Sequence, residues 1–225
     1  MSQPRILIIT PIQDEYDHLC SSLAEMGLSL ENDKIGKLDV RRFPELRMTI
    51  ARGGHGKTQF GIQTQYLLDQ TNFDLVLCAG AAGALAPEVQ VGDLIVATVT
   101  FEHDYNLKFA KRPNPQFMGD MNSIEQIQRL NLKNEPFNIH FGIMASGDED
   151  VIEIERGREL RMLTNALGVA WEGVGGARAC AFSGVPYLEL RGATDTANHE
   201  APVVFDENLK IVMAHISLLL TAWLR

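Results

Sequence analysis

Three carboxylates follow apolar segments, at places where acidic side chains could do acid–base chemistry. Asp14 and Glu15 come just after the apolar run 5–10, and Asp195 ends the segment 186–195. Both apolar segments are typical of β-strands. In an open α/β sheet, catalytic groups often lie beyond the carboxyl ends of the strands. Two carboxyl groups placed there could act as a general base and a general acid.

The same residues also permit a purely structural interpretation. Residues 13–26 have apolar side chains at helical spacing, which places Asp14 and Glu15 in the first turn of a helix. The helix dipole stabilises carboxylates there by a few tenths of a kcal/mol up to about 1 kcal/mol. Asp195 alone could cap a helix or turn. The local pattern therefore leaves both interpretations open.

The elements that would position these groups alternate between strands and helices. Four apolar residues, 75–78, predict a strand buried on both faces, and the small residues 79–84 predict a tight loop that a ligand can approach closely. Further strands are expected over 37–43, 46–51, 91–101 and 138–145. Further helices are expected over 58–70, 123–130, 158–167 (ended by Gly168) and from a cap at Asp206, with Ile211 on the inner side of the last. This alternation indicates an α/β fold.

Composition narrows the class of protein. The 225 residues are 45% hydrophobic and 22% charged, as in a globular domain with a substantial core. The net charge of −9 argues against a nucleic-acid polymer as partner, and the sequence suggests neither a membrane span nor a secretory signal. Three widely spaced cysteines predict buried thiols in a reducing, cytoplasmic compartment and no metal site. No cofactor is expected.

The small-residue loop and the following Val91-Gly92-Asp93 resemble the nucleoside phosphorylase/nucleosidase superfamily, most closely its methylthioadenosine/S-adenosylhomocysteine nucleosidases. The motifs come in the family's order along nearly the whole chain. The resemblance implies a single α/β domain over residues 1–225: a three-layer sandwich whose central mixed, partly barrel-like sheet is flanked by helices. It also implies hydrolysis of the N-glycosidic bond of a purine nucleoside or a 5′-modified relative, with release of the free base.

The resemblance assigns roles to individual positions. Glu15 matches the base that activates water, Arg191 helps to position that water, and Asp195 protonates the leaving purine. The remaining positions matched to substrate binding are Ala81, Ala82, Gly83, Asp150, Val151, Glu172, Gly173, Val174 and Thr194.

Two of these positions depart from the family pattern. Asp150 stands where an aromatic residue stacks on the base, and Val174 is matched to a carboxylate that grips the sugar hydroxyls, with Glu172 the candidate to replace it. Losing both contacts would weaken transition-state binding by roughly a hundredfold or more. From this we expect poor cleavage of methylthioadenosine and S-adenosylhomocysteine, and a preference for 6-oxopurine nucleosides, whose N1–H could donate to Asp150.

Other functions remain open. A phosphorylase would need cationic phosphate ligands, and a non-catalytic nucleoside-binding homologue could have kept the fold. Residues 51–58 fit a loosened phosphate-loop pattern, but a close-packed turn from strand to helix is the better interpretation. We expect at least a homodimer, with contacts from residues 103–115 that close the nucleoside site.

Overall fold

The sheet and the helices that cover it are seen in a computed structural model, which describes residues 3–110, 112–198 and 200–225. Lys111, part of the expected interface loop, lies outside them. The strands are β1 (Ile6–Thr10), β2 (Glu31–Ile35), β3 (Leu38–Phe43), β4 (Met48–Arg52), β5 (Leu75–Ala84), β6 (Leu94–Glu102), β7 (Gln116–Met118), β8 (Ile139–Ser146), β9 (Gly168–Ala170) and β10 (Tyr187–Asp195). The helices are α1 (Gln13–Glu25), α2 (Lys57–Gln70), α3 (Met121–Gln128), α4 (Ile154–Thr164), α5 (Gly173–Ser183) and α6 (Ala201–Leu224).

The ten strands of the described residues belong to one mixed sheet, and part of that sheet closes on itself. The order runs β10-β6-β8-β9-β5-β1-β4-β3-β2, β7 pairs with β6, and β10 also pairs with β5. Five strands therefore form a closed ring, while β1, β4, β3 and β2 extend from it as an open sheet. Strand β1 reads as a continuous apolar run because both of its faces are covered. Strand β10 is equally buried but also carries polar side chains, among them Glu189, Arg191 and Asp195.

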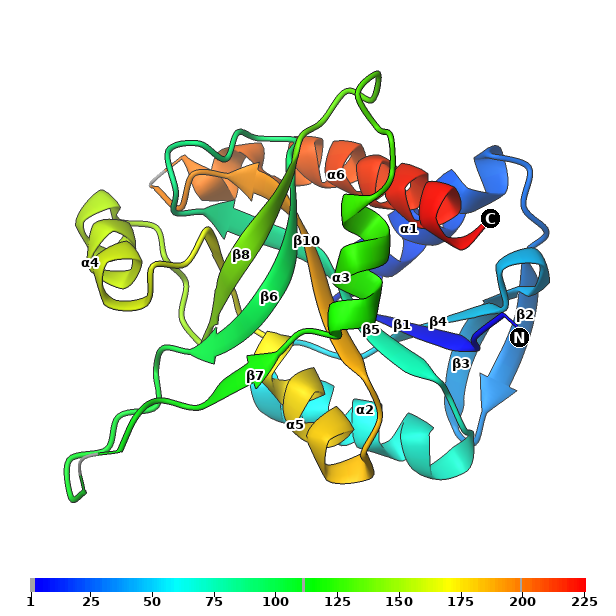
Figure 1. The fold of residues 1–225 in the computed structure, drawn as a ribbon, viewed down its shortest axis with the longest axis horizontal. Coiled ribbons are helices and arrows are strands. Elements are labelled where there is room, and N and C mark those ends of the chain that lie inside the picture. The colour runs from blue at the N-terminus through cyan, green and yellow to red at the C-terminus, as the bar shows by residue number, and fades with distance from the viewer. Residues whose placement is uncertain (1–2, 111, 199) are drawn as a thin grey trace.

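Helices cover the sheet on both sides (Figure 1). On one side α1 packs against α6, and on the other α2 packs against α5. One apolar cluster lies beneath α1 and α6, and a second lies beneath α2 and α5. Across the described part of the chain, no helix is long and apolar enough to cross a membrane. The predicted layered α/β architecture with a partly barrel-like sheet is confirmed.

The expected loop at 79–84 is wrong, because β5 continues to Ala84. Its small residues pair with β10, from Val76 opposite Tyr187 to Gly83 opposite Asp195. Small side chains are needed here for a different reason. A Cβ at Gly80 would lie 2.5 Å from Glu15 Oε1 and 2.9 Å from Arg191 Nη1. Glycine is therefore required at this position of β5, because Glu15 and Arg191 pack directly against the backbone there.

Other boundaries also differ from expectation. Helix α6 begins at Ala201, so Asp206 lies inside it and caps nothing, and Ile211 is 45% exposed instead of facing inward. Helix α4 ends at Thr164 and is capped by Asn165 in the left-handed conformation (φ 55°), whereas Gly168 starts β9. The polar edge strand β2 was not predicted, since its pattern lacks an apolar face.

Candidate active site

A cavity of about 460 Å³ opens at the carboxyl ends of β1, β5 and β10. Ten of the predicted site residues line this cavity: Glu15, Ala81, Ala82, Gly83, Asp150, Val151, Glu172, Arg191, Thr194 and Asp195. Residues separated by as many as 180 positions thus meet because parallel strands end at one edge of the sheet.

Glu15 is buried at the start of α1, with 3% of its surface exposed. Its Oε2 accepts the backbone N–H of Ile12 (2.9 Å), and its Oε1 accepts that of Ala81 (2.8 Å). Burial raises the pKa of Glu15 to about 7, against the opposing charge of Arg191. A carboxylate with this pKa is poised to accept a proton near neutral pH.

Arg191 lies beneath the cavity and is 1% exposed. Its Nε donates to Glu189 Oε1 (2.8 Å), and its Nη1 donates to the carbonyl of Ala81 (3.1 Å). Its Nη2 lies 3.4 Å from Glu172 Oε2 and 3.3 Å from Cys78 Sγ. This guanidinium therefore compensates two buried carboxylates and fixes the backbone of β5 beside Glu15.

Glu172 reaches the cavity from the connection between β9 and α5. It is 3% exposed, and its Oε1 accepts the N–H of Gly56 (3.2 Å) and lies 3.2 Å from His55 Nδ1. Burial alone would raise its pKa, but the contacts with His55, Arg191 and Gly56 hold that pKa below its usual value. Glu172 is thus an anion at neutral pH.

Asp195 ends β10 at another wall of the cavity. Its Oδ2 accepts the hydroxyl of Thr194 (2.8 Å), and its Oδ1 accepts the N–H of Ala197 (2.8 Å). Burial raises the pKa of Asp195 in spite of these two hydrogen bonds. A carboxyl group that holds its proton more tightly is suited to donate it to a leaving group.

Two predicted substrate-binding positions do not line the cavity. Val174 is fully buried, and its backbone N–H donates to Ser146 Oγ (3.0 Å). Gly173 packs against Glu189, where any Cβ would collide with the carboxylate. Val174 does not reach the cavity because α5 begins at Gly173 and the Val174 side chain is buried in the core. The carboxylate that lines the cavity from this segment is Glu172.

The phosphate-loop alternative is also wrong. Lys57, its would-be phosphate ligand, lies 3.0 Å from Glu102 and pairs with Asp104 as well. The turn before α2 is close-packed, since a Cβ at Gly53 would lie 2.5 Å from the Phe60 ring. The sequence pattern reflects tight packing between β4 and α2.

This turn nevertheless contributes to the site, which the sequence did not predict. His55 lines the cavity beside Trp171, with ring centroids 4.3 Å apart. The only available signal was its place in a Gly-X-Gly turn after a strand, which is weak by itself. Other lining residues that were missed are Pro11, Ile12, Glu149, Ile152, Val169, Ala170, Ala201, Pro202 and Phe205.

Comparison with known proteins gives the family. Residues 5–225 match the family model of the phosphorylase superfamily. The chain belongs to the phosphorylase superfamily. The family predicted from the small-residue strand, the Val-Gly-Asp segment and the later motifs is therefore confirmed.

Relatives within the phosphorylase superfamily carry nucleosidase names. A 5′-methylthioadenosine/S-adenosylhomocysteine nucleosidase of Tolumonas auensis is 28% identical over 184 residues, which cover 78% of this chain and 80% of the relative. The enzyme of the same name from Shewanella halifaxensis is 25% identical over 98% of this chain and 99% of its own.

Solved structures agree with this fold. The Neisseria meningitidis 5′-methylthioadenosine/S-adenosylhomocysteine nucleosidase, in complex with methylthio-immucillin-A, has a TM-score of 0.83 and 25% identity, covering 97% of each chain. The Helicobacter pylori futalosine hydrolase has a TM-score of 0.84 and 23% identity, covering 97% of this chain and 96% of its own. At 23% identity, the second similarity shows the fold alone.

Proposed function

We propose that the cavity binds a purine nucleoside or a 5′-modified relative and hydrolyses its N-glycosidic bond. The predicted enzyme class, an N-ribosyl hydrolase, agrees with the nucleosidase names of the relatives. The observation that carries the proposal is Glu15, a buried carboxylate facing the cavity with a pKa of about 7. Asp195 lines the same cavity and supplies a second carboxyl group with a raised pKa.

The two carboxyl groups divide the reaction between them. Asp195 donates its proton to a ring nitrogen of the purine as the bond between that base and the anomeric carbon breaks. The sugar becomes oxocarbenium-like, and a water molecule attacks the anomeric carbon. Glu15 takes the proton that this water releases, so free base and free sugar leave. Arg191 steadies the Glu15 side of the site through its hydrogen bond to the Ala81 carbonyl.

Charge favours water over phosphate as the nucleophile. Five carboxylates line the cavity: Glu15, Glu149, Asp150, Glu172 and Asp195. The two basic lining residues, Arg191 and His55, already contact carboxylates. A phosphate dianion would meet net negative charge and would find neither of these cations free to pair with it, which disfavours its binding.

Glu172 is the group we propose to bind the sugar hydroxyls. It is an ionised acceptor on the cavity wall, and Arg191 contacts both it and the backbone next to Glu15. A charged acceptor for a sugar hydroxyl contributes about 1.5–3 kcal/mol. With this carboxylate in place, one of the two reasons to expect poor cleavage of methylthioadenosine disappears.

Asp150 remains the residue on which the choice of base depends. It is exposed at the rim of the cavity, beside the buried Val151. Its carboxylate cannot stack on a purine, but it can accept a hydrogen bond from a ring N–H. A preference for 6-oxopurine nucleosides stays a prediction, and it now rests on this residue alone.

A nucleoside panel tests the proposal directly. Adenosine, methylthioadenosine, S-adenosylhomocysteine, inosine, guanosine and 2′-deoxy forms are incubated with the protein, with and without phosphate, and free base and sugar products are quantified. We expect free base together with free sugar at a rate independent of phosphate. Formation of a sugar 1-phosphate would identify a phosphorylase instead. Absence of base release from every nucleoside would favour a non-catalytic homologue.

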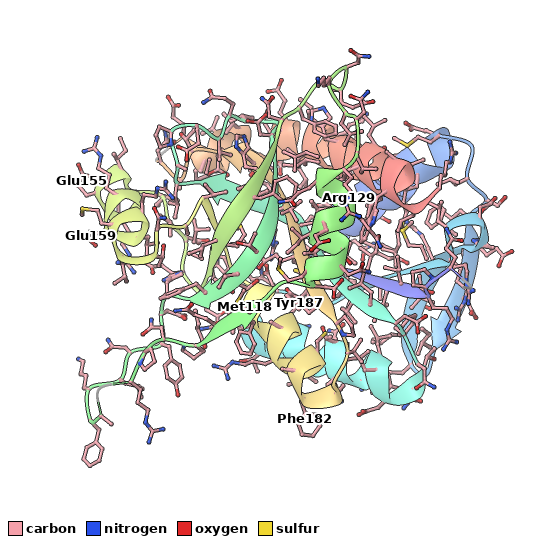
Figure 2. All side chains as sticks on the ribbon, viewed as in Figure 1. Met118, Arg129, Glu155, Glu159, Phe182 and Tyr187 are labelled. Atoms are coloured by element: carbon pink, nitrogen blue, oxygen red, sulfur yellow. The ribbon has the colours of Figure 1, made fainter. Side chains whose placement is uncertain are left out.

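We also propose a cytoplasmic homodimer. The three cysteines are buried free thiols, as suits a reducing compartment. Large apolar side chains are exposed at the surface, among them Phe182 (85%), Met118 (67%) and Phe109 (105%). Figure 2 shows Phe182 projecting from α5 and Met118 at the end of β7 that leads into α3. A second copy would bury these side chains.

Sedimentation at micromolar concentration checks the assembly. We expect a dimer, and substituting Phe182 and Met118 by serine should shift it toward monomer. A fully active monomer would contradict a role for the neighbour in closing the site.

A further inference from the structure

His55 is the cavity residue whose role the proposed mechanism leaves unexplained. Its Nδ1 lies 3.2 Å from Glu172 Oε1, and its ring packs against Trp171 at a tilt of 31°. Just over half of its side chain, 56%, is exposed. It therefore joins a buried carboxylate to a part of the site that solvent reaches.

Glu172 needs this partner because Arg191 is shared. The Arg191 guanidinium lies 2.8 Å from Glu189 and 3.4 Å from Glu172. Glu189 is itself fully buried and has the shorter contact, so one positive charge serves two buried carboxylates. A buried charge without adequate compensation is costly, and the remaining donors to Glu172 are His55 and the N–H of Gly56.

The charges that act on His55 favour its protonated form. Glu172, before α5, contacts it, and the charges of Asp150, between β8 and α4, and Glu15, on α1, act on it as well. The hydrogen bond to Glu172 is the largest of the effects that raise the pKa of His55. Asp148, whose Oδ1 accepts the N–H of Lys57, adds another nearby carboxylate behind the turn.

The backbone around His55 holds the ring in place. Gly54 (φ +86°) and Gly56 (φ +80°) both adopt conformations that favour glycine. Residues 54–56 thereby turn so that the His55 side chain and the Gly56 N–H meet the same oxygen of Glu172. Packing against Trp171 restricts the ring further.

We propose that His55 is a positioning residue whose Nδ1–H donates to Glu172 and holds that carboxylate toward the sugar. This inference rests on the proposed role of Glu172 in sugar binding. It makes His55 a determinant of the affinity for ribonucleosides that acts without touching the bond that breaks.

Two variants of His55 separate pairing from packing. His55→Phe keeps a flat ring against Trp171 but removes the donor, whereas His55→Asn places an amide nitrogen near the position of Nδ1. We expect kcat/KM for the best ribonucleoside to fall about tenfold or more in His55→Phe, mainly through KM, and to recover largely in His55→Asn. Equal losses in both variants would overturn the proposal.

A double-mutant cycle tests whether His55 acts through Glu172. In a Glu172→Gln background, His55→Phe should change kcat/KM by less than about twofold, since the two residues then no longer form a pair. Independent, additive losses would contradict positioning.

A pH titration of the histidines followed by NMR tests the pairing of His55 with Glu172 without any measurement of activity. The pKa of His55 should lie above its ordinary value in the wild-type protein and fall in Glu172→Gln. An unchanged His55 pKa would overturn the inference even if the nucleosidase is active. If the protein cleaved no nucleoside but the His55 pKa still fell in Glu172→Gln, the proposed function would be contradicted while the pairing of His55 with Glu172 would hold.

Discussion

Glu15 and Glu172 both line the cavity and both lie at a junction between a strand and a helix, but their environments differ. Glu15, at the junction of β1 and α1, has two backbone N–H donors, and burial raises its pKa to about 7. Glu172, at the junction of β9 and α5, is equally buried but contacts His55 and Arg191, which hold its pKa below the usual value. Both are glutamates that are 3% exposed, so burial alone does not set their chemistry.

The difference separates a proton acceptor from a fixed anion. A carboxylate that compensating cations keep ionised can accept hydrogen bonds from sugar hydroxyls but is a poor base. A carboxylate held mainly by backbone dipoles in a dry site binds a proton more readily and releases it near neutral pH. Pairs of titratable groups whose environments separate their pKa values are typical of active sites.

Replacing Glu15 should have the largest effect. Glu15→Gln keeps the shape of the side chain but removes the base, so we expect kcat to fall by about 10² to 10⁴ with KM little changed. Steady-state base release measures this. If Glu172→Gln lowered kcat as much as Glu15→Gln, the two carboxylates would not have separate roles.

Replacing Glu172 should have a smaller effect of another kind. Loss of a charged acceptor for the sugar costs about 1.5–3 kcal/mol, so kcat/KM should fall roughly 10- to 150-fold in Glu172→Gln. The loss should appear mostly in KM, and it should shrink for 2′-deoxynucleosides. An equal loss for ribo- and deoxynucleosides would show that Glu172 does not contact the 2′-hydroxyl.

The pH profile should reveal both environments at once. Because Glu15 must be ionised to accept a proton, kcat/KM should fall about tenfold per pH unit below its pKa of about 7. The negative charge of Glu172 contributes to that raised pKa, so Glu172→Gln should shift this limb to lower pH. A profile without an inflection near pH 7 would remove Glu15 from the role of base.

The smallest expected effect is on the free energy of unfolding, which should depend on pH because Glu15 is buried. Its pKa is raised in the folded state, so its contribution to stability is complete below about pH 4.5 and is lost as pH rises through about 7. This loss amounts to at most about 3 kcal/mol. The difference in Tm between Glu15→Gln and wild type should therefore be several degrees more positive at pH 8 than at pH 5. A difference that does not vary with pH would mean that Glu15 titrates normally.

Much of this site could be predicted because it follows local sequence patterns. Glu15 follows a buried strand at the start of a helix, and Asp195 ends another buried strand, so both lie at one edge of the sheet. The order of motifs indicated the family, and the composition fitted an α/β domain. These features depend on the periodicity of apolar residues in strands and helices, which can be recognised within short stretches of sequence.

Tertiary structure decided which side chains face the cavity and what charge they carry. Val174 and Glu172 are two positions apart, yet only Glu172 lines the site, because α5 begins between them. His55 gained its partner from a glutamate 117 positions away, and β5 continued through its small residues because β10 paired with them. Such outcomes depend on contacts between distant segments and on the low dielectric of the interior, and neither is encoded in local spacing.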